Sequence, residues 1–588
     1  MLFTPPVRPC RFAAAIFVAA LSFCGLDTRS APRIEVYDPA VMLGSVHNEG
    51  TDGELPRYNH APDVVRFKGR FIASWMGNAA AGEGKAGQSL YFSTSDDFRT
   101  WSRPARPFAS TIAAEEPTES HAQHIPWQPA FVNYRDEVLF CAWSIVGQNR
   151  LIVSRTTDGV TWTHTDVPNA PDSLKGTVTG FPSGHGLLSS RGELLIPCSL
   201  PPSGKKGLWI RNPYQAVLRS TDAGKTWHWS QPIEGSLWSA SGNDPARYDG
   251  DDAIYHWELS LFEKANGALG YVARNTSRMP DPKFENYLTV LTGESTDHGL
   301  TWTRATPVQI DSVSARPFAA KRSPADGLFV VTNDWVRTVP QPAWNTRFGL
   351  SLMLSSVDDP NLLLPGPLVQ PDATVACYPN GFIHENRLHL IYTQGRGEYG
   401  YANIRTAVID PLPNFNAPFL LPRDARSGLL IHDRIASFHL PESTLGLVLP
   451  QELTEKPGLV LTFESRMDSA TNEFPLLSIG GKIRNGVNIR IAAIPGTGDH
   501  RYQARLSGAD TWQAIAPCEL NRWNRVTVEL RTESVILTIN DAPPVHFSGP
   551  ILRKIAFGGL HTAPIWPRPS KTNLPPVTSL RLDSIHVR

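Results

Sequence analysis

The chain has 588 residues, with 55 lysines and arginines balanced by 55 aspartates and glutamates. This length predicts two or more domains, and the balanced charge argues against binding to nucleic acid or to an anionic membrane surface. The 16 tryptophans, 45 glycines and 51 prolines favour a protein rich in β-strands and turns.

The N-terminal segment carries Arg8 and Arg11, then an apolar run from Phe12 to Leu26 and small residues up to Ala31. This order is typical of a secretory signal peptide, and the apolar run is too short for a membrane span. We therefore predict that residues 1–31 are a signal peptide and that the mature protein is secreted or periplasmic.

Four cysteines remain after this segment, and each lies in or beside an apolar, strand-like run. None of them has the spacing of metal ligands. The spacing is compatible with four buried thiols, and one disulfide that the sequence cannot assign is the alternative. These cysteines are Cys141, Cys198, Cys377 and Cys518.

A repeated motif follows. Ser220–Trp227 and Ser295–Trp302 both fit Ser-x-Asp-x-Gly-x-Thr-Trp, and weaker copies run from Thr94 to Trp101 and from Arg155 to Trp162. The tryptophans recur at intervals of roughly 60 to 75 residues, enough for one small antiparallel sheet. In such a turn the aspartate binds backbone amides, the glycine supplies a positive φ and the tryptophan fills the space between sheets.

These turns resemble the Asp-box repeats of sialidase-type β-propellers, over about residues 40 to 420. The resemblance implies an all-β propeller over residues 32–424. Six or seven blades fit the length, and we favour seven because the first and last segments could close one blade together. Propellers host many functions, so the boxes predict the fold and not the chemistry.

Residues 425–588 follow a proline-rich linker and alternate apolar and polar side chains at period two. This alternation predicts sheets with one buried face. The hairpin from Trp523 to Asp541 is similar to a central hairpin of laminin-G or concanavalin-like β-sandwiches of the jelly-roll type. That resemblance implies a glycan-binding module, and a structural appendage packed on the propeller is the alternative.

Propellers bind ligands at the axial end where their inner strands converge, which we call the mouth. Asn59 and His60 precede the first propeller strand. Sialidases carry an Arg-Ile-Pro arginine here, which this chain lacks, and the loop 77–88 offers only Glu83 in place of their aspartate acid. With Gln88, the stretch resembles propeller α-L-rhamnosidases, rhamnose–glucuronate lyases and ulvan lyases instead.

That second resemblance implies that His60 is catalytic and that Asn59 and Gln88 bind substrate. Histidine suits the task, because its ordinary pKa lies near neutrality and it can give or take a proton. His185 precedes another strand pair in the same way, and Asn333 ends a later strand. We place both among the substrate-binding candidates.

Three further candidates are similar to sialidase positions. Glu258 and Arg274 match a segment that supplies a buried glutamate and a carboxylate-binding arginine, with a cross-strand salt bridge as the alternative. Arg347 stands where sialidases carry a later arginine. Tyr378 is similar to their nucleophile, which a neighbouring glutamate activates.

We expect a secreted enzyme that cleaves a glycosidic bond beside an acidic sugar, foremost a uronic acid, as a rhamnose–glucuronate-type lyase or an α-L-rhamnosidase. An exo-α-sialidase-type hydrolase and a non-catalytic glycan-binding propeller are the alternatives. The expected partner is an acidic oligo- or polysaccharide, and the chain is expected to be a monomer or weak oligomer. No metal or cofactor is required, although a structural calcium ion stays open.

Overall fold

The structure is a computed structural model, and its first unit, Met1–Arg33, contains the predicted signal peptide, which lies outside the described residues. Within the described ranges, no helix combines the length and the apolar character needed to cross a membrane. The described residues are 34–48, 56–79, 82–84, 87–113, 125–146, 148–175, 180–200, 215–233, 256–275, 290–308, 315–333, 347, 349–370, 375–395, 401–423, 429–439, 443–468, 473–480, 486–507, 509–549, 551–558 and 578–588.

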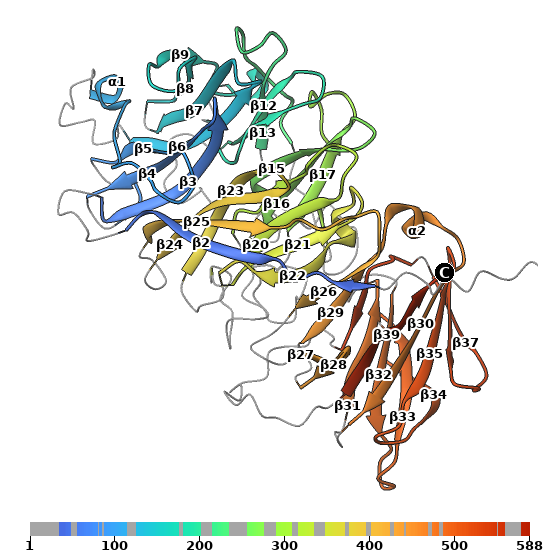
Figure 1. Cartoon of the computed structure of the whole chain (residues 1–588). Helices are drawn as coiled ribbons and strands as arrows, with labels where there is room; N and C mark the ends of the chain where they lie inside the picture. Colours follow the sequence, from blue (N-terminus) through green and yellow to red (C-terminus); the bar gives the residue numbers. More distant parts are fainter. Residues whose placement is uncertain are drawn as a thin grey trace, which may run out of the picture. The chain divides into compact units, whose positions relative to one another are not determined.

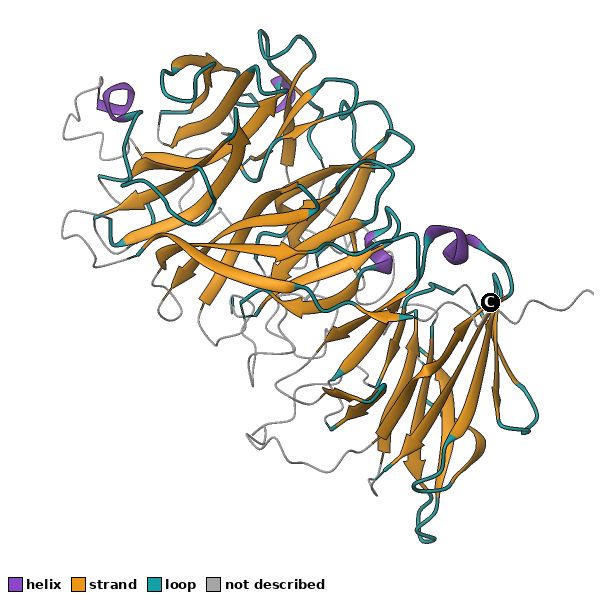
Figure 2. Cartoon of the chain, viewed as in Figure 1, coloured by secondary structure: helices purple, strands orange, loops and turns teal. Residues whose placement is uncertain are grey.

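Residues 40–410 form a six-bladed β-propeller, in which each blade is one small antiparallel sheet (Figures 1 and 2). The blades, in chain order, are β3 (Tyr58–Phe67), β4 (Arg70–Asn78) and β5 (Ser89–Ser95); β6 (Ile125–Tyr134), β7 (Val138–Val146), β8 (Arg150–Thr156) and β9 (Thr163–Val167); β10 (Phe181–Pro182), β11 (Leu187–Leu188), β12 (Leu194–Ser199), β13 (Gln215–Ser220) and β14 (His228–Trp229); β15 (His256–Glu263), β16 (Leu269–Asn275), β17 (Leu291–Ser295) and β18 (Thr306–Pro307); β19 (Phe318–Ala320), β20 (Leu328–Asn333), β21 (Leu350–Ser355) and β22 (Leu364–Leu368); and β23 (Val375–His384), β24 (Arg387–Gly395), β25 (Tyr401–Asp410) and β2 (Ala40–His47).

The ring closes in two ways. Strand β23 of the sixth blade contacts β3 of the first blade. The N-terminal strand β2 also pairs with β25, so that the two ends of the propeller share the sixth blade. The prediction that the first and last segments close one blade together is therefore confirmed, but the preference for seven blades is wrong.

The propeller core lies between neighbouring blades. Successive side chains of a strand pack alternately against the blade before it and the blade after it. Val64 therefore packs against blade six, and Val65 packs against blade two. Leu194 and Leu195 divide in the same way between blades two and four. Because both faces of a blade are buried, its strands are nearly continuous apolar runs, in contrast to the period-two pattern of a sheet with one wet face.

The four predicted boxes are all turns closed by their aspartate, and the two complete copies are one residue longer within the turn than the two weaker ones. In each box, the aspartate accepts hydrogen bonds from backbone amides two to four residues later, as Asp222 does from Thr226 at 2.9 Å. Asp297 likewise accepts from the backbone amide of Thr301 at 2.9 Å. Trp227 lies against Phe140 of the preceding blade, with 5.6 Å between ring centroids, so this tryptophan fills the space between two blades.

The C-terminal part consists of two sheets that share one apolar core. Their facing sides meet at contacts such as that between Phe463 and Phe557, whose ring centroids are 4.9 Å apart. The first sheet, in spatial order, contains β1 (Glu35–Val36), β26 (Phe419–Arg423), β29 (Thr444–Val448), β38 (Ile555–Phe557), β31 (Glu473–Ile479), β32 (Val487–Ala493), β33 (His500–Leu506) and β34 (Gln513–Cys518). The second contains β27 (Leu429–His432), β28 (Ile435–Phe438), β39 (Thr578–Val587), β30 (Leu459–Met467), β35 (Asn524–Leu530), β36 (Ser534–Ile539) and β37 (Val545–Ser548).

Strand β30 alternates buried and half-buried residues along its length, as the sequence predicts for sheets with one buried face. Two short α-helices, α1 (Ala109–Ala113) and α2 (Gln451–Glu455), lie in connecting segments. The four cysteines are free and buried, so the prediction of buried thiols is confirmed for Cys141, Cys198, Cys377 and Cys518.

Candidate active site

Four inner strands carry a β-bulge at the same distance from the mouth. The register shifts at His60/Asp63 in β3, Trp127/Ala130 in β6, Trp257/Leu259 in β15 and Cys377/Asn380 in β23. A bulge adds one residue to a strand and re-aims its side chain. The bulged residues all have positive φ although none is glycine: Ala61 at 50°, Gln128 at 27°, Glu258 at 51° and Tyr378 at 56°.

The bulges bring Glu258 and Tyr378 together at Arg274. Arg274 Nη1 donates to Glu258 Oε2 at 3.0 Å and to Tyr378 Oη at 3.0 Å. The first of these bonds joins two strands of blade four, and the second reaches blade six. Gln128 Nε2 also donates to Glu258 Oε1 at 3.4 Å. The Glu258–Arg274 contact is therefore more than an isolated cross-strand salt bridge, because it belongs to a cluster to which three blades contribute.

Tyr378 is surrounded by positive charge. The guanidinium carbons of Arg316 and Arg347 lie 4.7 and 5.0 Å from the centroid of its ring. Burial raises the pKa of the Tyr378 phenol far above its usual value, and the negative charge of Glu258 acts in the same direction, while Arg274 and Arg347 oppose both. At neutral pH, Tyr378 is thus an un-ionised phenol that needs a proton acceptor before it can react.

His60 joins the cluster behind Tyr378. Its side chain is buried, its ring centroid is 4.1 Å from that of Tyr378, and its Nδ1 lies 3.2 Å from Thr393 Oγ1. Burial lowers the pKa of His60 well below its usual value, and the charge of Arg347 adds to this. The imidazole is therefore neutral, and its burial favours contact with Tyr378 over direct contact with a substrate.

Glu83 is a member of the cluster that the sequence argument passed over. Its side chain is exposed, yet the protein atoms that crowd it remove enough water to raise the pKa of its carboxyl to about 7. The charges of Arg347, Glu258 and Arg274 also act on this pKa, so Glu83 shares the field of the cluster. The sequence could have indicated Glu83, because it is the only acidic residue in the loop 77–88.

Gln88 fixes the loop that carries Glu83. Its Oε1 accepts from Gly84 N at 2.9 Å, and its Nε2 donates to Pro126 O at 2.6 Å. Both ends of its amide are thus engaged with the protein. Gln88 thus ties the residue next to Glu83 to the inner strand of the second blade, and its contact with substrate stays a prediction.

Two other predicted residues have their amides bonded within the fold. Asn59 is buried, donates to Ala402 O at 2.8 Å and accepts from the indole of Trp75 at 2.7 Å. Asn333 is buried as well and donates to Ala376 O at 2.6 Å. The structure places both next to the mouth strands, and these bonds join neighbouring strands of the propeller.

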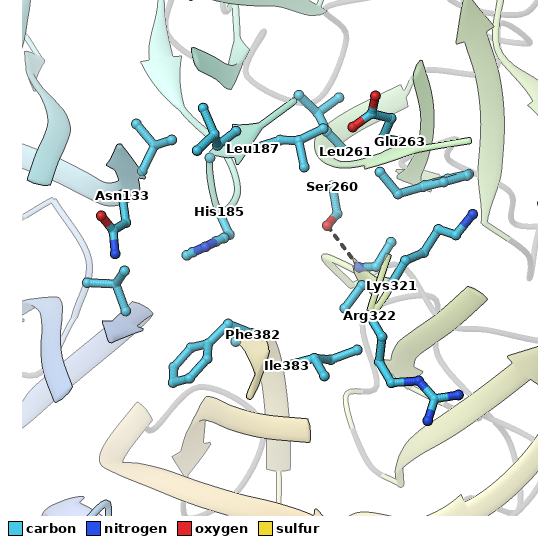
Figure 3. A pocket seen from close by; sticks show the side chains of 18 of the residues that line it. Asn133, His185, Leu187, Ser260, Leu261, Glu263, Lys321, Arg322, Phe382 and Ile383 are labelled. Carbon is cyan, nitrogen blue, oxygen red and sulfur yellow. Dashed lines mark hydrogen bonds between the residues drawn. The ribbon is translucent and has the colours of Figure 1, made fainter. Parts of the chain in front are cut away.

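The structure does not bring His185 to the mouth. His185 faces a cavity of ≈ 500 Å³ that is lined by residues such as Val65 and Phe382, which lie beyond His60 and Tyr378 on the same inner strands (Figure 3). This cavity is therefore at the opposite end of the axis. His185 Nδ1 bonds to the buried Asp63 Oδ1 at 2.8 Å, which orients the imidazole.

The remaining polar contacts at that cavity are made within the protein. Glu263 accepts from Ser190 N at 2.7 Å, and Ser260 Oγ accepts from Ala319 N at 2.9 Å. Among the described residues, no three histidine, cysteine, aspartate or glutamate side chains gather as metal ligands. Among the described residues, the candidate catalytic side chains that contact one another are those around Tyr378.

Comparison with known proteins gives one family match and several distant structural likenesses. The model of the BNR repeat-like domain matches residues 69–405. No curated protein matches the sequence. Among solved structures, a Trypanosoma rangeli sialidase in complex with sialic acid is 12% identical, with a TM-score of 0.47 over 93% of this chain and 96% of that one. A Dyadobacter fermentans protein of unknown function is 15% identical, with a TM-score of 0.43 over 63% and 99%. A leech intramolecular trans-sialidase is 12% identical, with a TM-score of 0.42 over 62% and 70%.

Proposed function

This chain belongs to the BNR repeat-like domain family, and we propose that it is an enzyme that cleaves a glycosidic bond beside an acidic sugar. The observation that carries the proposal is the hydrogen-bonded group of Glu258, Arg274 and Tyr378, which two blades build at the mouth. Two positive-φ backbone positions are held in place to form it, and strained residues of this kind cluster at functional sites.

An acidic substrate suits the charges around Tyr378. Arg274 and Arg347 both act on this side chain, and Arg347 is half-buried. A guanidinium presents a planar pair of donors that matches a sugar carboxylate. We infer the preference for a carboxylate on the sugar from the two guanidinium charges of Arg274 and Arg347, which both act on Tyr378.

The chemistry that these residues support best is hydrolysis with retention. The Tyr378 oxygen attacks the anomeric carbon as its proton passes to Glu258, while Glu83 gives its proton to the departing oxygen. Water then attacks the anomeric carbon, gives a proton to Glu83 and releases the phenol oxygen, which recovers its proton from Glu258. The raised pKa of Glu83 favours a carboxyl that can both hold and release its proton near neutral pH, as this exchange requires.

Elimination beside a uronic acid is the second candidate, and the neutral His60 in contact with Tyr378 favours it. In this reaction the C5 proton passes to a base, the electron pair forms a C4–C5 double bond and the C4–O bond breaks. The departing oxygen takes a proton from Glu83. Arginine charge on the uronate carboxylate makes the C5 proton easier to remove, and the His60–Tyr378 pair supplies the base.

One assay separates the two reactions. The purified protein is incubated with uronate-containing glycans such as gum arabic and ulvan and with a sialyl substrate, while ultraviolet absorbance and new reducing ends are followed together. New reducing ends without absorbance indicate hydrolysis, and absorbance indicates elimination. We expect Tyr378→Phe to lower the rate about 10³-fold or more. Tyr271→Phe, which changes another buried tyrosine of the propeller, is the matched control.

Three results would count against the proposal. Absence of cleavage on every substrate would favour a glycan-binding propeller. Cleavage that survives Tyr378→Phe would remove this tyrosine from the mechanism. Cleavage of uncharged glycans at equal rates would remove the need for an acidic sugar. His60→Ala serves as a further variant, because loss of elimination with intact hydrolysis would assign the histidine to the elimination alone.

A further inference from the structure

Arg316 is a completely buried arginine on the axis of the propeller. Its Nη2 donates to Pro62 O at 3.2 Å and to Tyr378 O at 3.4 Å, in blades one and six. Its Nη1 donates to Ser183 O at 3.4 Å and to Gln128 Oε1 at 3.5 Å, in blades three and two. One guanidinium on the fifth blade thus bonds to four other blades. Few side chains except arginine have enough donors for this.

Three of these four acceptors belong to the bulged segments or lie beside them. Pro62 follows the positive-φ residue Ala61, and Gln128 and Tyr378 are themselves positive-φ residues. A bulge interrupts the regular ladder of hydrogen bonds and leaves carbonyl groups without strand partners. Arg316 supplies donors to two such carbonyls, and so it stabilises the backbone that aims Tyr378 into the mouth.

Arg316 also places a fixed charge under the reacting ring. Its guanidinium carbon is 4.7 Å from the centroid of Tyr378. Burial lowers the pKa of Arg316, but Glu258 is the strongest of the groups that oppose this and the buried Asp63 adds to it. Glu258 and Asp63 thus offset part of the charge of Arg316, although Glu258 also pairs with Arg274, and the low dielectric of the axis strengthens the effect of Arg316 on the neighbouring ring.

We propose that Arg316 is a positioning residue of the active site, which holds the bulged backbone of Tyr378 and stabilises the negative charge that develops on its phenol during attack. The inference rests on the proposed function, in which Tyr378 is the reacting group. Because Arg316 is completely buried, it acts through Tyr378 and does not contact the substrate. Arg347, which is half-buried beside the same ring, has the complementary role of binding the sugar carboxylate.

A split between kcat and KM tests this division of roles. We expect Arg316→Met to lower kcat about 100-fold with KM within about twofold, because only the transition state loses stabilisation. Arg316→Lys, which keeps the charge and loses the fork, should recover part of the rate. Arg347→Met should raise KM for the acidic substrate. Rates are normalised to folded protein by near-ultraviolet circular dichroism.

Arg423→Met is the matched control, because Arg423 is equally buried but lies on β26 of the C-terminal part. It should lower the melting temperature and leave kcat unchanged. An unchanged kcat in folded Arg316→Met would overturn the proposal, since a purely structural arginine changes the amount of folded enzyme and not its turnover.

A second measurement does not need turnover. The equilibrium constant of unfolding is measured for Arg316→Lys, Tyr378→Leu and the double variant. We expect the change in this constant in the double variant to differ about tenfold from the product of the two single changes. Additive effects would overturn the proposed contact, whatever the activity. If the wild-type protein cleaves no substrate, the proposed function fails, while this cycle still decides whether Arg316 and the ring of Tyr378 interact.

Discussion

The side chains of Glu258 and Tyr378 meet because the backbone under each has a conformation that L-residues disfavour. Each such position costs roughly 1–3 kcal/mol and persists only where the surrounding contacts enforce it. Here Arg274 binds both side chains, and Arg316 binds the carbonyl of Tyr378. The cost is thus offset by contacts that also define the orientation of the reactive groups.

The raised pKa of Glu83 makes a specific prediction about pH. A general acid must carry its proton, so kcat/KM should decline as the pH rises above about 7. Glu83→Gln should remove this decline and lower the rate about 100-fold for ordinary glycosides. Substrates with an activated aryl leaving group need little acid assistance, so Glu83→Gln should change their rate of cleavage very little. The measurement is kcat/KM between pH 5 and 9.

Glu137→Gln is the control for that series, because Glu137 is an exposed glutamate in the turn between β6 and β7. It should leave the profile unchanged. A decline above pH 7 that persists in Glu83→Gln with the same midpoint would assign the titration to another group.

At the scale of single residues, the sequence predicted the side chains at the centre of the site more accurately than those around it. Glu258, Arg274, Arg347 and Tyr378 come together, and His60 contacts Tyr378. Glu83 was passed over because an aspartate was expected in its loop. The amides of Asn59, Gln88 and Asn333 bond to backbone carbonyls of neighbouring strands, and such partners are set by the tertiary fold.

At the scale of elements, the boxes determine how neighbouring blades fit together. Gly224 has a φ of +80°, and a Cβ atom there would lie 2.1 Å from Phe140 Cζ in the preceding blade. A glycine is therefore required here for two reasons. Its backbone has a positive φ, and the side chain of Phe140 leaves no room for a Cβ atom. The spacing of the boxes predicted the turn and its positive φ, whereas the contact with Phe140 depends on how two blades pack.

Two glycine substitutions separate these requirements. Gly69 has a φ of +83°, and a Cβ atom there would meet nothing within 4 Å. Gly69→Ala should therefore cost about 1 kcal/mol, the backbone term alone. Gly224→Ala should cost about 1–3 kcal/mol more, because the added methyl group overlaps Phe140. Urea unfolding of both variants measures the difference, and equal losses would show that Phe140 moves aside without cost.

At the scale of the whole molecule, the count of blades depends on how the chain ends are used. The length and the repeat spacing allowed six or seven, because a shared blade consumes residues from both ends. Strand β2 completes the sixth blade beside β25. The two sheets of the C-terminal part were visible in the period-two pattern, but β1 and β26, which join the first of these sheets, fall inside the range predicted for the propeller.

Because the same box turn recurs around the ring, acid should weaken the propeller at several places together. Backbone amides of Thr100 and Arg99 lower the pKa of Asp97. Burial raises the pKa of Asp222, but hydrogen bonds from Thr226 and Ser220 outweigh it and lower the value to about 2. A lowered folded-state pKa contributes stability that is fully present above the unfolded value near 4 and is lost as the pH falls.

We therefore expect the melting temperature to decline gradually below about pH 6.5, because the buried His60 resists protonation, and to fall steeply between about pH 4 and 2, where the turn aspartates gain protons. The variant with Asp222→Asn and Asp297→Asn should start from a lower melting temperature at pH 6 and fall less steeply. Asp510→Asn, in an exposed position of the C-terminal part, should keep the wild-type slope. Equal slopes in the wild-type and box variants would mean that acid acts on other carboxylates, since protonation of the boxes would then contribute nothing to the loss.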